Sequence, residues 1–119
     1  MSKLQAAKRR GAKWEQEVAD FMVSAGFPLA ERRRLEGTQD RGDIAGVSGV
    51  VIEAKNEKKI TLSSYMKELY AEMYHAKADW GAAVVRQRGQ SEVGEAYAVL
   101  PFRDYCAMLR MLEGMPRNV

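Results

Sequence analysis

The segment that most constrains the fold is residues 50–55, which read Val-Val-Ile-Glu-Ala-Lys. Three consecutive β-branched apolar residues predict a buried strand. Side chains alternate along a strand, so Val51, Glu53 and Lys55 share one face. A carboxylate and an ammonium group therefore leave the same face of a strand that begins in the core. Burying a charge is unfavourable unless the charge is paired or binds a metal, so the segment predicts an ion pair or a binding site.

A second acid lies upstream, at Asp43 in the run Arg-Gly-Asp-Ile-Ala-Gly of residues 41–46. The Val-Ser-Gly sequence at 47–49 predicts a tight turn between this run and the strand. A hairpin of this kind sets Asp43 beside Glu53 and close to Lys55. We therefore expect two carboxylates and one ammonium group to converge on one point.

Paired carboxylates have a definite chemistry. They repel each other unless a cation lies between them, and oxygen ligands suit hard ions such as Mg²⁺ or Mn²⁺. Such an ion polarises a phosphodiester and lowers the pKa of a bound water. Lys55 would orient that water or stabilise the negative charge that develops on the phosphate. The alternative is a surface salt bridge, but the buried strand and the nearby Asp43 favour a site.

The basic residues of the chain occur in clusters. The chain has 119 residues, enough for one compact domain, with a net charge of +3 and a sequence pI of about 9.1. Clustered positive charge fits a polyanionic partner, most simply nucleic acid, although any single cluster also fits a solvated surface. The candidate nucleic-acid-binding residues are Lys8, Arg9, Arg10, Arg32, Arg33, Arg34, Arg86 and Arg88.

Cysteine and histidine are too few for two common kinds of site. One cysteine, Cys106, and one histidine, His75, exclude an internal disulfide and a Cys/His zinc site. No apolar run approaches the length of a membrane span, and the first residues lack the apolar segment of a secretory signal. We therefore expect an intracellular protein that binds neither zinc nor a membrane.

Apolar periodicity predicts the element order α-β-β-β-α-β-β-α in one domain covering residues 1–119. The expected fold class is α/β, with a mixed β-sheet flanked by helices. Glu15 and Glu17 lie on opposite flanks of the first helix, and periodicity does not choose between them. The expected elements are a loose basic arm at 1–8, a helix to about Ala25, a strand at 28–35, the hairpin, a helix capped by Thr61 or Ser63, strands at 81–85 and 96–100, a helix after Pro101, and a loose tail at 114–119.

Two of the expected helices carry wide apolar stripes. In the helix that begins near residue 62, apolar side chains recur at the spacing of one helical face. This stripe predicts core packing that extends into a subunit interface, as does the stripe of the final helix. The expected inward-facing residues of the final helix are Phe102, Tyr105, Cys106 and Leu109.

The order Gly42-Asp43-Ile44, then Ile52-Glu53-Ala54-Lys55, then a helix, resembles the core motif of the PD-(D/E)XK nucleases. The run Arg10-Gly11-Ala12-Lys13-Trp14-Glu15 resembles the opening of archaeal and phage-type Holliday-junction resolvases. This resemblance covers roughly residues 8–105. It implies a restriction-endonuclease-like core, a homodimer, and metal-dependent cutting of two strands of a four-way DNA junction.

The resemblance also implies roles for individual residues. Asp43, Glu53 and the main-chain carbonyl of Ala54 would bind Mg²⁺ or Mn²⁺, and Glu15 would complete the active site as an additional candidate ligand. Lys55 would serve the attacking water, and Glu17 would be a surface residue.

The chain departs from that family at several positions. Gly42 replaces the proline of the motif, the hairpin is shorter, and Lys67 and Glu68 lie where many relatives carry a glutamine. Thr38 is the nearest substitute for a serine of the loop before the aspartate, and is a further candidate DNA contact. These differences concern substrate preference more than reaction type. The alternatives are a nuclease acting on flaps, forks or single strands, and a DNA-binding relative without catalysis.

Overall fold

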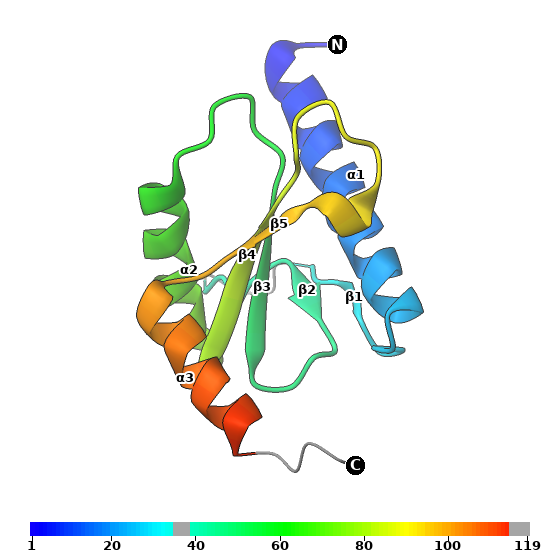
Figure 1. Ribbon diagram of the computed structural model, residues 1–119. Coiled ribbons are helices and arrows are strands. Elements are labelled where there is room, and N and C mark those ends of the chain that lie inside the picture. The colour runs from blue at the N-terminus through cyan, green and yellow to red at the C-terminus, as the bar shows by residue number, and fades with distance from the viewer. Residues whose placement is uncertain (35–38, 115–119) are drawn as a thin grey trace.

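The predicted element order is confirmed by the computed structural model, which describes residues 1–34 and 39–114. The described residues form a small α/β fold with a mixed sheet (Figure 1). One short 3-10 helix, η1, was not expected. The elements are α1 (Lys3–Ser24), β1 (Glu31–Arg32), β2 (Ile44–Ala45), β3 (Val50–Lys55), α2 (Leu62–Ala76), β4 (Trp80–Val85), η1 (Val93–Glu95), β5 (Tyr97–Val99) and α3 (Phe102–Glu113).

The strands form two sheets joined at one main-chain hydrogen bond. In the larger sheet the order is β3-β4-β5, with β3 parallel to β4 and β4 antiparallel to β5. The smaller sheet is the antiparallel pair β1–β2. The N–H of Asp43 donates to the carbonyl of Ile52 at 2.9 Å, which connects the segment before β2 to β3. The expected hairpin ladder is wrong, because β2 pairs with β1 and not with β3, but this hydrogen bond still places Asp43 beside the second half of β3.

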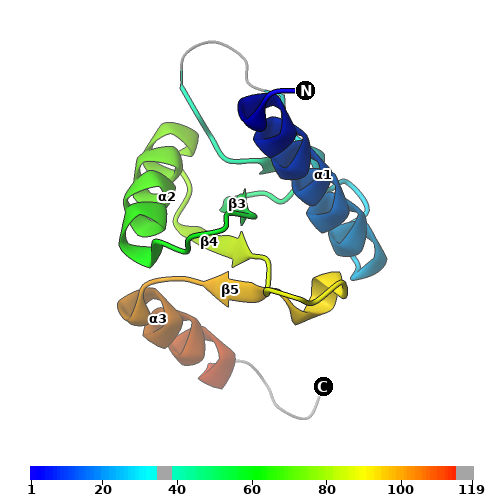
Figure 2. The same ribbon diagram turned by 90° about the horizontal axis from the view of Figure 1, so that it is seen from above.

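Two helices cover the larger sheet on opposite faces. Figures 1 and 2 show α1 on one side of β3 and α2 on the other. Alternation along β3 follows the expected pattern, because Ile52 packs with Trp14 of α1 whereas Val51 packs with Leu69 of α2. The indole N–H of Trp14 also donates to the carbonyl of Val84 in β4, at 3.2 Å. The side chains of Glu53 and Lys55 consequently face α2.

The expected loose arm at residues 1–8 is wrong, because α1 begins at Lys3. Ser2 and Gln5 form a capping box in which the Ser2 hydroxyl accepts from the Gln5 N–H and the Gln5 side chain accepts from the Ser2 N–H. The residues that follow are good helix formers, so a capped start extends the helix over the basic residues. None of the described helices is long and apolar enough to cross a membrane.

The first predicted strand is also shorter than expected, since β1 contains only Glu31 and Arg32. Just after β2, the partner of this strand, Gly46 has φ +90°, and a Cβ built there would lie 1.8 Å from the main-chain carbonyl oxygen of Leu29. Only glycine permits so close an approach of two backbone segments. Residue 35, which completes the predicted strand, lies outside the described residues, as do residues 115–119 of the predicted tail.

The apolar stripes of α2 and α3 have different environments. Tyr65 and Leu69 of α2 are fully buried inside the protomer, so this part of α2 serves the core and is not free for a subunit contact. The expected inward face of α3 is wrong at three of its four residues: Phe102 is 78% exposed, and Tyr105 and Leu109 are exposed as well, whereas Cys106 is half-buried. The helix contacts Tyr70 of α2 through two residues: the Arg103 guanidinium donates to the Tyr70 hydroxyl at 3.0 Å, and that hydroxyl donates to Asp104 Oδ2 at 3.5 Å.

Candidate functional site

The end of β3 carries a buried acid and a half-buried base that both face α2. Glu53 is only 4% exposed, and its Oε2 lies 3.6 Å from the Nζ of Lys55. The same Nζ donates to Glu68 Oε2 at 2.5 Å and lies over the ring of Tyr65. Burial lowers the pKa of Lys55, but the hydrogen bond to Glu68 and the charge of Glu53 outweigh burial and raise it. Lys55 is therefore a stable cation, suited to orienting water and stabilising negative charge rather than to removing a proton.

Asp43 is held against the same end of β3. Its Oδ2 accepts a hydrogen bond from the main-chain N–H of Ala54 at 2.8 Å. Burial raises the pKa of Asp43 to about 6, against the lowering effect of that hydrogen bond, and the negative charges of Glu15 and Asp40 raise it further. The structure thus brings Asp43, Glu53 and Lys55 together, as the sequence predicts.

The first helix adds the acid that sequence periodicity alone did not identify. Glu15 accepts a hydrogen bond from Arg32 Nε at 2.8 Å and lines the same cleft as the residues of β3. Glu17 is not among the residues that line it. The cleft has a volume of about 500 Å³, and its wall includes Arg10, Glu15, Asp40, Asp43, Glu53, Ala54, Lys55 and Glu68.

Two further acids, Asp40 and Glu72, were missed by sequence reasoning. Glu72 is 4% exposed on α2, and one carboxylate oxygen from each of Asp40, Glu53 and Glu72 lies within 4.8 Å of the others. Burial raises the pKa of Glu72 to about 7, and burial together with the charge of Asp43 raises that of Glu53 above its ordinary range. The available signal was position, because Glu72 follows Leu69 by three residues and so interrupts a buried helical face with a charge.

The donor set of this region fits a hard divalent cation. Among the described residues, Glu53 Oε1 and Glu72 Oε2 are buried without a hydrogen-bond partner. Buried carboxylate oxygens without partners are unfavourable and rare in folded proteins. A cation with oxygen preference would satisfy them, and Asp43 with the Ala54 carbonyl would offer neighbouring oxygen ligands.

No family model, curated protein or solved structure matches this chain. Its function is therefore inferred from the residues of the site and from the sequence motifs.

A second cleft, with a volume of about 1100 Å³, continues from the first. The two clefts share Glu15, Asp40 and Asp43, and the second is lined on its other side by the arginine block, Arg32, Arg33 and Arg34. The Nε of Arg33 is buried without a partner. Guanidinium groups beside the carboxylates are well placed to neutralise an extended polyanion that enters the cleft.

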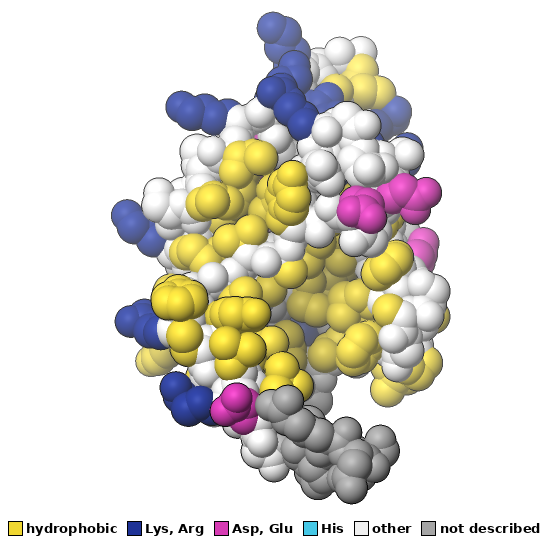
Figure 3. All heavy atoms as spheres, in the orientation of Figure 1, with side chains coloured by type: hydrophobic (Ala, Val, Ile, Leu, Met, Phe, Trp, Pro, Cys, Tyr) yellow, Lys and Arg dark blue, Asp and Glu magenta, His cyan; other side chains and the backbone are white. Residues whose placement is uncertain are grey.

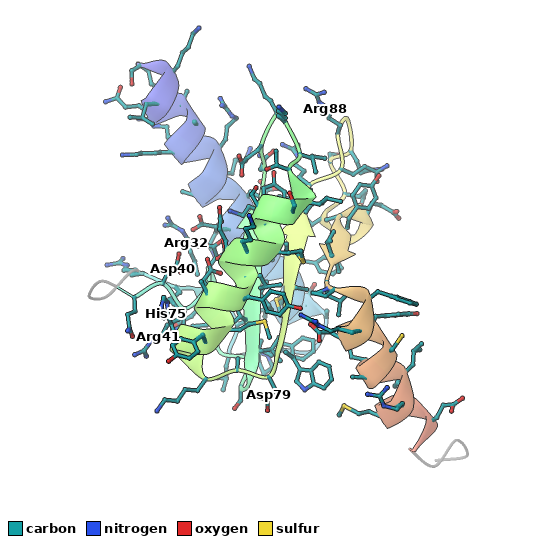
Figure 4. All side chains as sticks on the ribbon, turned by 90° about the vertical axis from the view of Figure 1, so that its left-hand side faces the viewer. Arg32, Asp40, Arg41, His75, Asp79 and Arg88 are labelled. Atoms are coloured by element: carbon teal, nitrogen blue, oxygen red, sulfur yellow. The ribbon has the colours of Figure 1, made fainter. Side chains whose placement is uncertain are left out.

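The other candidate nucleic-acid contacts lie at different distances from the cleft. Arg10 lines it directly, and Lys8 and Arg9 are exposed on the same part of α1. Arg86 follows β4, where its main-chain N–H donates to the carbonyl of Lys55 and its guanidinium carbon lies 6.0 Å from the centroid of the Trp14 ring. Arg88 lies on the loop beyond, well away from Arg32 (Figure 4). Thr38 lies outside the described residues.

Proposed function

We propose that this chain is a metal-dependent DNA endonuclease of the PD-(D/E)XK type. The observation that carries the proposal is the meeting of Glu15, Asp43, Glu53, Ala54 and Lys55 in one cleft. These residues come from three separate parts of the chain and match the motif positions of that family. The hydrogen bond from the Ala54 N–H to Asp43 fixes two of the proposed metal-binding groups relative to each other.

Each residue has a role in this proposal. Asp43, Glu53 and the carbonyl of Ala54 would hold Mg²⁺ or Mn²⁺, which would supply charge stabilisation for the phosphate and lower the pKa of a bound water. The water oxygen would form a bond to phosphorus and lose its proton to solvent, while the bond from phosphorus to the leaving oxygen breaks and that oxygen takes a proton from solvent. Lys55, kept protonated by Glu68 and Glu53, orients the water and stabilises the added negative charge. Glu15, paired with Arg32, would position the attacked strand and would be an additional metal ligand.

The proposed substrate is branched DNA, most specifically a four-way junction. The arginine block beside the acids supports a nucleic-acid substrate, and the junction itself follows from the resemblance of the N-terminal motif to Holliday-junction resolvases. A junction presents two equivalent strands, and a two-fold homodimer presents one site to each.

The face that carries α3 supports the proposed dimer. Hydrophobic side chains gather there, while lysine and arginine side chains lie mainly along the edges of the molecule (Figure 3). An exposed apolar face of this kind is typical of a contact surface. The exposed apolar residues of α3 are Phe102, Tyr105, Met108, Leu109, Met111 and Leu112.

The deciding experiment offers labelled four-way junction, flap, fork, single-stranded and duplex DNA side by side, with Mg²⁺, with Mn²⁺ and in excess chelator. We expect paired nicks on opposite strands of an immobile junction, dependence on metal, and a dimer by light scattering. Full cleavage in chelator would refute the metal mechanism. If the chain is a monomer that prefers flaps or single strands, the proposal of a nuclease stands and the proposal of junction resolution is rejected.

Replacement of the arginine block should weaken DNA binding without changing sequence preference. Arg32, Arg33 and Arg34 are expected to bind phosphates, so removing one of these arginines should reduce the slope of log affinity against log salt by about one unit. Single Arg→Gln variants, measured by fluorescence anisotropy at several salt concentrations, test this. Arg110→Gln on α3 is the matched control, since this exposed arginine lines neither cleft. An unchanged slope with an altered sequence preference would contradict the assignment.

A further inference from the structure

The carboxylate of Glu72 has no part in the proposed cleavage centre, yet it is as deeply buried as Glu53. Both residues are only 4% exposed, and each has one carboxylate oxygen without a hydrogen-bond partner. The two side chains face each other from α2 and β3, and Asp40 brings a third carboxylate to the same point. The face of α2 that packs on β3 and β4 is otherwise apolar, so this burial of negative charge requires a compensating group.

We propose that Asp40, Glu53 and Glu72 form a second divalent-cation site, which shares only Glu53 with the proposed cleavage centre. The site lies between α2 and β3 and takes a hard cation such as Mg²⁺, Mn²⁺ or Ca²⁺. It goes beyond the proposed nuclease activity, because it concerns cation binding by the folded chain in the absence of DNA.

The spacing of the oxygens fits one shared ion. Ligand oxygens that bind one hard cation at about 2.0–2.6 Å lie at most about 4–5 Å apart. The three carboxylates each offer an oxygen within 4.8 Å of the other two. A set made only of oxygens favours hard ions over Zn²⁺, which prefers sites that include nitrogen or sulfur ligands.

The charges also favour a divalent ion. Three carboxylates carry three negative charges when ionised, and the ammonium group of Lys55 is shared between Glu53, at 3.6 Å, and Glu68. The chain itself therefore offsets only part of this negative charge. A divalent cation would offset more of it than a monovalent ion would.

The backbone around Asp40 is fixed in a way that keeps its carboxylate over α2. Nδ1 of His75 lies 2.9 Å from the main-chain oxygen of Asp40, and the Asp40 side chain accepts from the Gly42 N–H at 2.9 Å. His75 is three residues after Glu72 on the same helix, so the contact places Asp40 beside Glu72. Figure 4 shows Asp40 and His75 together at the edge of α2.

The test measures Mn²⁺ binding to the chain without DNA. Calorimetry gives the affinity and the number of bound ions, and electron paramagnetic resonance gives the concentration of free Mn²⁺. We expect the wild-type chain to bind two Mn²⁺ ions. The Glu72→Gln variant should bind one of these ions at least tenfold more weakly. Asp43→Asn should lose the other ion and keep the Glu72-dependent one. Glu17→Gln, which changes a carboxylate outside the cleft, is the matched control.

Two results would overturn this second site. One is a folded Glu72→Gln variant that binds Mn²⁺ as the wild type does. The other is loss of the same single ion in both Glu72→Gln and Asp43→Asn, which would indicate one shared site. If Glu72→Gln does not fold by circular dichroism, Asp40→Asn answers the same question, because Asp40 is exposed and its replacement leaves the core unchanged. This test does not measure DNA cleavage, so its result is valid even if the chain has no nuclease activity.

Discussion

The Glu53→Gln variant should cut branched DNA at least about a thousandfold more slowly than the wild-type chain. Glu53 lies close to three other charged residues of the site: it is beside Asp43, faces Glu72 and pairs with Lys55 at 3.6 Å. Glutamine keeps the shape of the side chain but removes the charge that would hold a metal ion. Cleavage of a labelled junction in Mg²⁺ measures the effect.

The same substitution should preserve folding and DNA binding. Removing one negative charge from a crowded group of carboxylates relieves repulsion, so affinity for the DNA phosphates should hold or rise. Asp43→Asn and Lys55→Ala should also abolish cutting, and Glu15→Gln should impair it. Glu17→Gln is the matched control and should cut normally. A Glu17→Gln variant as inactive as Glu15→Gln would reject the assignment of Glu15, and rapid cutting by a folded Glu53→Gln variant would reject the proposed mechanism.

The Gly46→Ala variant should lose about 3–5 kcal/mol in the free energy of unfolding. A Cβ at residue 46 would lie 1.8 Å from the Leu29 carbonyl oxygen and 2.9 Å from the Ala30 nitrogen, so the backbone before β1 would have to move. The left-handed φ of +90° adds a conformational penalty for any residue with a Cβ. Urea unfolding followed by circular dichroism gives the free energy.

Gly89→Ala separates the two contributions to that destabilisation. Gly89 also has a left-handed φ, of +72°, but a Cβ there would meet no atom within 4 Å. This variant should therefore be destabilised by about 1 kcal/mol, from conformation alone. Equal destabilisation of the two variants would show that the close approach of Gly46 to Leu29 does not matter for stability.

Local pattern was sufficient to predict much of this fold and part of its site. The alternation in residues 50–55 predicted which side chains face together, and the short turn after Asp43 predicted its neighbour on β3. Both relations involve residues close in sequence, where backbone geometry limits the choices. The central position of β4 followed from its continuous apolar run.

The features that sequence did not predict depend on contacts between distant elements. Glu72 joins the cluster with Asp40 and Glu53 only because α2 packs over β3, and its spacing from Leu69 gives no indication of which strand it faces. Asp40 is placed by a contact with His75, 35 residues later. The start of α1 was mispredicted because a side-chain cap at Ser2 outweighs the exposure of the basic residues. The exposed face of α3 has the periodicity of a core helix but lacks a partner within the described part of the chain.

The contact between Trp14 and Val84 joins residues 70 positions apart, and it has a consequence for how the chain folds during its synthesis. Glu15 is synthesised early, but the helix that carries it packs against β3 and β4, and β4 is made much later. A growing or truncated chain without β4 offers no complete surface for that helix, and long-range pairing of this kind forms slowly. The acids of the cleft therefore come together only in the finished fold, so the unfinished chain lacks the complete carboxylate cluster.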